Sequence, residues 1–148
     1  PLAWAAASLV KMLVATPAGR LSDRRGTRVV LVWGWLLRVS LLSLLALAPA
    51  AGAAVWILFA AYAGSLAATE AAERSMVGDL APSALRGTIF GVYHLATGLV
   101  ALPGAVLFGL LWQAAGPAVA FLAAAAVTAA AALLMMRLAG GATPRAPA

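Results

Sequence analysis

Residues 95–136 read LATGLVALPGAVLFGLLWQAAGPAVAFLAAAAVTAAAALLMM, a run of 42 residues without a charged side chain. As one helix this run would be about 63 Å long, about twice the thickness of a bilayer's hydrocarbon core. The run must therefore fold back once. Residues 114–117, AAGP, provide the turn, because Gly ends helices and Pro opens the next one. The stretch predicts two antiparallel membrane helices joined by a short turn.

Two further apolar stretches precede this run. Residues 39–69 are uncharged and are interrupted by Pro49 and Gly52, and residues 2–18 are mostly apolar, with Lys11 as their one charged residue. The stretches are rich in Ala and Leu and lack the alternating ten-residue pattern of barrel strands. The sequence therefore predicts an all-α fold, a polytopic transmembrane helix bundle with about five spans at 2–18, 28–48, 53–80, 84–113 and 117–138.

The composition excludes a water-soluble domain. Of the 148 residues, 65% are hydrophobic and 9% are charged, whereas a soluble domain carries about a quarter charged residues. The net charge of +6 does not indicate a nucleic-acid partner, because the bases are few and separated by apolar runs. The absence of cysteine excludes disulfides, thiolate metal sites and cysteine nucleophiles. Because the chain starts at Pro1 without a basic leader, we expect a fragment of a longer membrane protein.

The basic residues indicate the orientation of the bundle. Alternation of five spans places the connection 19–27, the turn 81–83 and the tail after Met136 on one side, while the opposite connections carry no charge. By the positive-inside rule this side is cytoplasmic and residue 1 lies outside. We expect a multi-pass protein of the bacterial cytoplasmic membrane, with the bundle over 1–139 and a short cytoplasmic tail over 140–148. The arginines on the cytoplasmic side are Arg20, Arg24, Arg25, Arg28, Arg74, Arg86, Arg137 and Arg145.

The first cytoplasmic connection, residues 19–28, reads GRLSDRRGTR. By charge alone it could be any short loop held at the anionic inner leaflet. As a pattern it resembles the G-x-L-x-D-R-x-G-R-K/R signature of the major facilitator superfamily, and Thr27 departs from it where the family usually has a base. Residues 79–87, DLAPSALRG, are similar to another cytoplasmic turn of these transporters. The residues that match the signature are Gly19, Leu21, Asp23, Arg24, Gly26 and Arg28.

This resemblance covers the whole chain and implies a secondary active transporter. In that family two helix bundles rock around a central site, so that a small solute crosses by alternating access, and residues 19–28 would form a cytoplasmic latch. The signature occurs in both halves, but the chain stops soon after the fifth span. Residues 98–104 also contain only Pro103-Gly104 of the antiporter signature expected in the fifth helix of many drug exporters. We therefore favour helices eight to twelve, the C-terminal half, over the N-terminal half.

The resemblance also implies the partners of the chain. They are membrane lipid, a small-molecule substrate, protons as a candidate coupling ion, and the N-terminal half of the same chain. Because no nucleotide-binding loop is present, a gradient would supply the energy. No cofactor and no metal is expected.

A charged side chain within a membrane span costs about 2.5–3.5 kcal/mol on insertion scales. We therefore expect each one to have a structural partner or a function. Arg38 lies about 14 Å along its helix from Val29. Its side chain could snorkel toward the cytoplasm or make a structural pair, or it could form a functional pair with Glu70 or Glu73. Lys11 is a candidate structural partner or ligand contact of the same kind.

The third span is the most polar. Five of its side chains fall within an arc of about 140°, with Arg74 just beyond, which suits a pathway for a polar substrate or a proton. Alternatively, the helix is about 42 Å long, so its cytoplasmic end could carry interface salt bridges, including an i,i+4 pair of Glu70 and Arg74. The five side chains are Tyr62, Ser65, Thr69, Glu70 and Glu73.

The fourth span carries a seam of small residues around one imidazole. A stripe of this kind lets another helix approach closely, and the resemblance implies that the opposite half packs there. His94, the one histidine of the chain, is a candidate proton carrier or a hydrogen-bonded structural residue. The seam comprises Gly87, Gly91, His94, Gly98, Ala101, Ala105 and Gly109.

Two other functions compete with transport. A transporter-like sensor or scaffold would keep the latch but tolerate loss of the polar face of the third span. An intramembrane protease is a remote alternative, because Glu70, Glu73, Arg74 and His94 superficially resemble glutamate-based membrane peptidases. Those enzymes have adjacent Glu pairs and two His sites, whereas this chain has one His, which also argues against a metal site. We therefore do not expect an enzyme.

Overall fold

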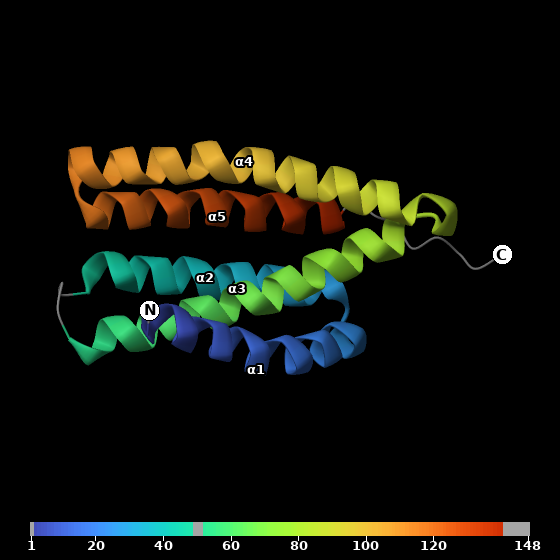
Figure 1. Ribbon diagram of the computed structural model, residues 1–148, viewed down its shortest axis with the longest axis horizontal. Coiled ribbons are helices and arrows are strands. Elements are labelled where there is room, and N and C mark those ends of the chain that lie inside the picture. The colour runs from blue at the N-terminus through green and yellow to red at the C-terminus, as the bar shows by residue number, and fades with distance from the viewer. Residues whose placement is uncertain (1, 49–51, 141–148) are drawn as a thin grey trace.

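The computed structural model describes residues 2–48 and 52–140 and is all-helical over that range. The predicted fold class is thus confirmed. The predicted interruption at Pro49 and residues 141–148 of the predicted tail lie outside the described residues. The described elements follow one another in the order α1 (Leu2–Arg25), α2 (Thr27–Leu47), α3 (Ala53–Leu80), the 3₁₀ turn η1 (Ser83–Leu85), α4 (Arg86–Ala115) and α5 (Pro117–Gly140); Figure 1 labels the α-helices.

Four segments of the described chain are long and apolar enough to cross a membrane. A fifth span, formed by α1, stays a prediction. The four segments are Thr27–Leu47, Ala53–Leu80, Ser83–Ala115 and Pro117–Leu138.

The helices run back and forth along one long axis. The α1–α2 connection, the α3–α4 connection and the end of α5 lie at one end of the bundle, and the α4–α5 turn lies at the other (Figure 1). Helix α2 packs against both α3 and α5, α1 covers α3, and α4 packs mainly on α5. This is the alternation on which the predicted orientation depends.

The predicted loop over residues 19–27 is wrong, because α1 continues to Arg25 and only Gly26 separates it from α2. The Arg and Leu residues of this stretch are good helix formers, and a glycine within a helix costs only about 1 kcal/mol. Helix α1 ends before Gly26, whose φ of 87° favours glycine. The Gly26 N–H donates to the Ser22 carbonyl at 2.9 Å. The reversal between the two helices thus takes a single residue.

The other turns lie close to their predicted places. Helix α3 has the predicted bounds, and Gly116, with a φ of 87°, separates α4 from α5. Helix α4 begins at Arg86 rather than residue 84. The reason is the 3₁₀ turn before it, in which the Leu85 N–H donates to the Pro82 carbonyl at 3.0 Å.

The buried core lies where α2, α3 and α5 meet. Val30, Leu31 and Ala72 form its centre, and Leu31 is wholly buried. Small residues bring the backbones together around this core. At Gly34 of α2, an added methyl group would collide with Thr69 of α3. The partly buried side chains packed against the core are Trp35, Met76 and Met135.

Helix α4 is the least covered helix, with no buried residue. A Cβ added at Gly87, Gly91 or Gly98 would meet no other atom within 4 Å. The predicted seam therefore lies on an open face of the described part of the chain, and packing of the opposite half against it stays a prediction.

Candidate functional site

A polar cavity of about 280 Å³ lies where α2, α3 and α4 face one another. Apart from Leu66, its lining consists of polar and charged side chains, in a bundle that is otherwise apolar. The cavity brings together five of the seven predicted pathway residues and adds two that the sequence did not indicate, Tyr93 and Thr97. Its lining residues are Arg38, Leu66, Thr69, Glu70, Glu73, Arg74, Tyr93, His94 and Thr97.

Arg38 reaches the cavity from the middle of α2. Its Nη2 donates to Oγ1 of Thr69, a fully buried residue. Among the described residues, Arg38 forms no ion pair with a carboxylate, and Glu70 and Glu73 have other partners. A functional pair of Arg38 with Glu70 or Glu73, the alternative to snorkelling or a structural pair, stays a prediction. The buried Nε of Arg38 has no hydrogen-bond acceptor in the described part of the chain.

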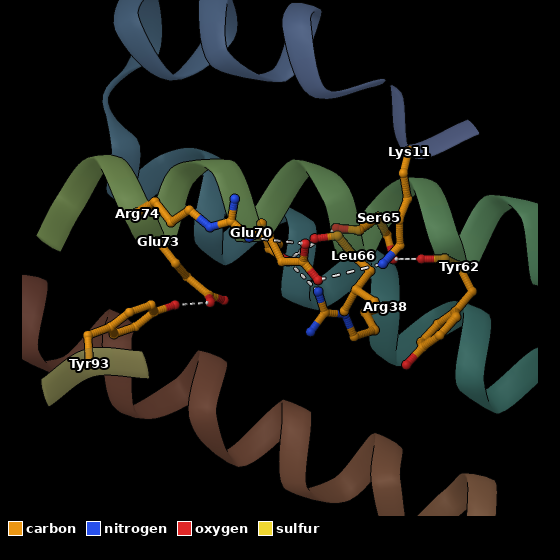
Figure 2. Close-up of polar contacts among 10 residues, drawn as sticks. Lys11, Arg38, Tyr62, Ser65, Leu66, Glu70, Glu73, Arg74 and Tyr93 are labelled. Atoms are coloured by element: carbon orange, nitrogen blue, oxygen red, sulfur yellow. Dashed lines mark hydrogen bonds and ion pairs between the residues drawn. The ribbon is translucent and has the colours of Figure 1, made fainter. Parts of the chain in front are cut away.

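Glu70 lies between two cations. Its Oε1 is 3.7 Å from Lys11 Nζ, which extends from α1, and its Oε2 is 3.8 Å from Arg74 Nη2 (Figure 2). The i,i+4 pair of Glu70 and Arg74 is thus confirmed, and Lys11 is a partner of Glu70. The carboxylate therefore ties α1 to α3 next to the cavity.

Glu73 accepts a hydrogen bond from the Tyr93 hydroxyl at 3.1 Å, which joins α3 to α4 (Figure 2). The Tyr93 ring also meets the neighbouring His94 ring edge to face, with 5.1 Å between ring centroids. The sequence analysis did not single out Tyr93, because it considered only the seam of small residues and His94 in α4. The position of Tyr93 directly before His94 could have indicated this residue.

Two of the predicted pathway residues do not line this cavity. Ser65 is buried and donates to the Tyr62 carbonyl at 2.7 Å, within its own helix. The Tyr62 side chain lines a second cavity instead. The predicted polar arc is therefore divided along α3, and only the part from Thr69 to Arg74 faces the polar cavity.

The second cavity has a volume of about 740 Å³ and is lined by the end of α2, the first half of α3, the end of α4 and the start of α5. Three of its rings, from Phe108, Trp112 and Phe121, lie 5.6–5.9 Å apart in tilted and edge-to-face arrangements. No pattern in the sequence indicates this cavity, since aromatic residues in apolar runs also suit lipid contact. Its lining is Leu42, Leu45, Ala46, Ala48, Val55, Trp56, Phe59, Tyr62, Phe108, Trp112, Pro117, Ala118, Phe121 and Ala124.

The signature residues lie at the α1–α2 reversal. Asp23 is exposed and forms no ion pair with another described residue. The Ser22 hydroxyl donates to the Thr27 hydroxyl oxygen at 3.2 Å, across the single-residue break. Thr27, which departs from the signature, thus helps to join the two helices. A latch role for this segment stays a prediction.

Comparison with known proteins gives one match. No curated protein and no solved structure matches the chain. The family model of the Major Facilitator Superfamily matches residues 2–148, which is nearly the whole chain. That match agrees with the apolar helices and with the signature at residues 19–28. The chain therefore belongs to the Major Facilitator Superfamily and is part of an integral, multi-pass membrane transporter.

Proposed function

We propose that the polar cavity is part of the solute pathway of a secondary active transporter that moves a small solute by alternating access. The main support is that charged side chains of α2 and α3 line one cavity deep in the bundle, where Lys11 of α1 also contacts Glu70. Arg38 lies about 16 Å from the start of α2, and Glu70 lies about 15 Å from the end of α3. Charges at such a depth are costly in lipid and mark substrate or ion pathways.

The same proposal assigns the chain to helices eight to twelve, with residues 19–28 on the cytoplasmic side. Protons are the proposed coupling ion. Glu73 and His94 are the candidate carriers, because both line the cavity and neither forms an ion pair with a described residue. Transport by rocking bundles would expose these groups to one side of the membrane at a time.

Glu73→Gln tests proton coupling. In the full-length protein reconstituted into liposomes, we expect accumulation of a solute found by substrate screening to fall at least about tenfold. Exchange of that solute without a gradient should persist, because the amide keeps the size of the side chain but cannot release a proton. Tyr93→Phe should have a smaller effect, since it leaves the carboxylate in place. Equal accumulation by the wild type and Glu73→Gln would argue against Glu73 as the carrier.

Asp23→Asn tests the latch. We expect the substitution to slow transport about tenfold while the protein still inserts, because Asp23 is exposed and supports no packing within the described chain. The matched control is Arg20→Gln, which changes a charge at a variable position of the signature. Initial uptake rates, normalised to inserted protein, measure the effect. Unchanged rates in both variants would contradict the latch role, whereas the absence of uptake by the wild type would favour a sensor or scaffold without transport.

A further inference from the structure

The lining of the polar cavity carries two cations, Arg38 and Arg74, and two carboxylates, Glu70 and Glu73. Lys11 does not line the cavity, but it contacts Glu70 from α1. With Lys11 included, the group has one positive charge without a counter-charge among the described residues. An unbalanced charge in a membrane bundle is costly. The excess therefore indicates that the cavity is suited to an anion.

The unmatched cation is Arg38. Glu70 is bound by Lys11 and Arg74, and Glu73 accepts the hydrogen bond from Tyr93. Within residues 2–48 and 52–140, the one partner of Arg38 is the neutral hydroxyl of Thr69, although a guanidinium has five N–H donors. Its Nε is buried and without an acceptor in the described chain, while the same side chain lines the cavity.

We propose that the solute is a small monocarboxylate whose carboxylate group binds the guanidinium of Arg38. This inference rests on the transport function proposed above and names its substrate class. A carboxylate matches the planar guanidinium in two parallel hydrogen bonds and carries the single negative charge that balances the site. A phosphate group carries a larger negative charge than a carboxylate and would therefore be repelled more strongly by Glu70 and Glu73.

The rest of the cavity sets the size and polarity of the solute. A volume of about 280 Å³ is just below the range of drug-sized sites, so the molecule is small. The side chains of Tyr93, His94 and Thr97 border the cavity from α4 and can hydrogen-bond a hydroxyl or keto group beside the carboxylate.

Binding is tested with charged and neutral forms of the same molecule. The full-length transporter in detergent is heated with acetate, lactate, pyruvate or benzoate, with the corresponding amide, or with inorganic phosphate. We expect at least one carboxylate to raise Tm by several degrees while its amide does not. Arg38→Gln should abolish that shift and Arg38→Lys should keep part of it. A shift with phosphate alone, equal shifts with acid and amide, or no shift with any carboxylate would overturn the proposal.

The stability of the unliganded variant separates a solute site from a structural ion pair. Without ligand, Arg38→Gln should have the Tm of the wild type or a higher one, because it removes an unbalanced charge. A large fall in Tm would show that Arg38 neutralises a carboxylate elsewhere in the full-length protein and would overturn the proposal. Thr69→Val, which keeps the charge but removes the described hydrogen bond, should retain a carboxylate-dependent shift.

Flux measurements distinguish this inference from the transport function itself. Transport of a neutral or cationic solute that survives Arg38→Gln would contradict the monocarboxylate and leave the transporter intact. A carboxylate-dependent Tm shift without any flux would instead support the binding site and contradict transport.

Discussion

Gly34→Ala is expected to lower the free energy of unfolding by about 1–3 kcal/mol, the usual cost of overpacking a tight contact. The added methyl group would collide with Cγ2 of Thr69, a wholly buried, β-branched residue that cannot swing aside. Moving Thr69 would also disturb its hydrogen bond from Arg38. We therefore expect loss of thermal stability and of transport together, measured as Tm in detergent and as initial uptake rate.

If this collision causes the loss of stability, a second substitution at Thr69 should restore it. Thr69→Ser removes the methyl group that an alanine at position 34 would strike and keeps the hydroxyl, so the double variant should recover most of the lost stability. Gly78→Ala is the matched control on α3, because its Cβ would lie 3.8 Å from Phe90, an ordinary contact. If Gly34→Ala behaved like this control, α2 and α3 would not be as close as described.

Glu70→Gln is expected to lower both stability and insertion, because it leaves Lys11 and Arg74 facing each other without a carboxylate. One unpaired cation in a membrane segment costs about 2.5–3.5 kcal/mol, but the exposed fractions of about 40% for Glu70 and Lys11 allow partial solvation. We therefore expect a loss of about 1–3 kcal/mol. Tm and the yield of inserted protein measure it.

Removing the cation as well should restore the balance. Lys11→Met combined with Glu70→Gln is expected to recover most of the stability, since a neutral amide then remains beside Arg74 alone. Lys11→Met by itself should cost less than Glu70→Gln, because Arg74 stays paired with Glu70. Additive losses in the double variant would show that Lys11 and Glu70 do not interact in the membrane-embedded protein.

Much of the helical fold could be predicted because apolar length and turn residues are local properties. The Gly116-Pro117 turn and the bounds of α3 follow from them directly. The reversal at residues 19–28 could not be predicted in detail. Charged residues there suggest a loop, but Arg and Leu also favour a helix. The position of the helix break depends on one residue, Gly26, which has a positive φ.

The site was harder to predict than the fold, because its geometry depends on how helices pack. A helical wheel placed Thr69, Glu70 and Glu73 on one face of α3, and the structure brings these residues together at one cavity. The wheel gives no information about neighbouring helices, so it could not show that Arg38 meets Thr69 rather than a carboxylate. Nor could the wheel show that the Tyr93 hydroxyl on α4 meets Glu73 on α3.

The single-residue joint at Gly26 has a mechanical consequence. One residue has only two backbone dihedral angles to absorb a change of angle, and the hydroxyls of Ser22 and Thr27 bridge the same joint. Helices α1 and α2 are thus expected to tilt together as one rigid unit. Because Lys11 lies on α1 and Arg38 on α2, a displacement of the α1–α2 joint would move both cations relative to α3 at the same time.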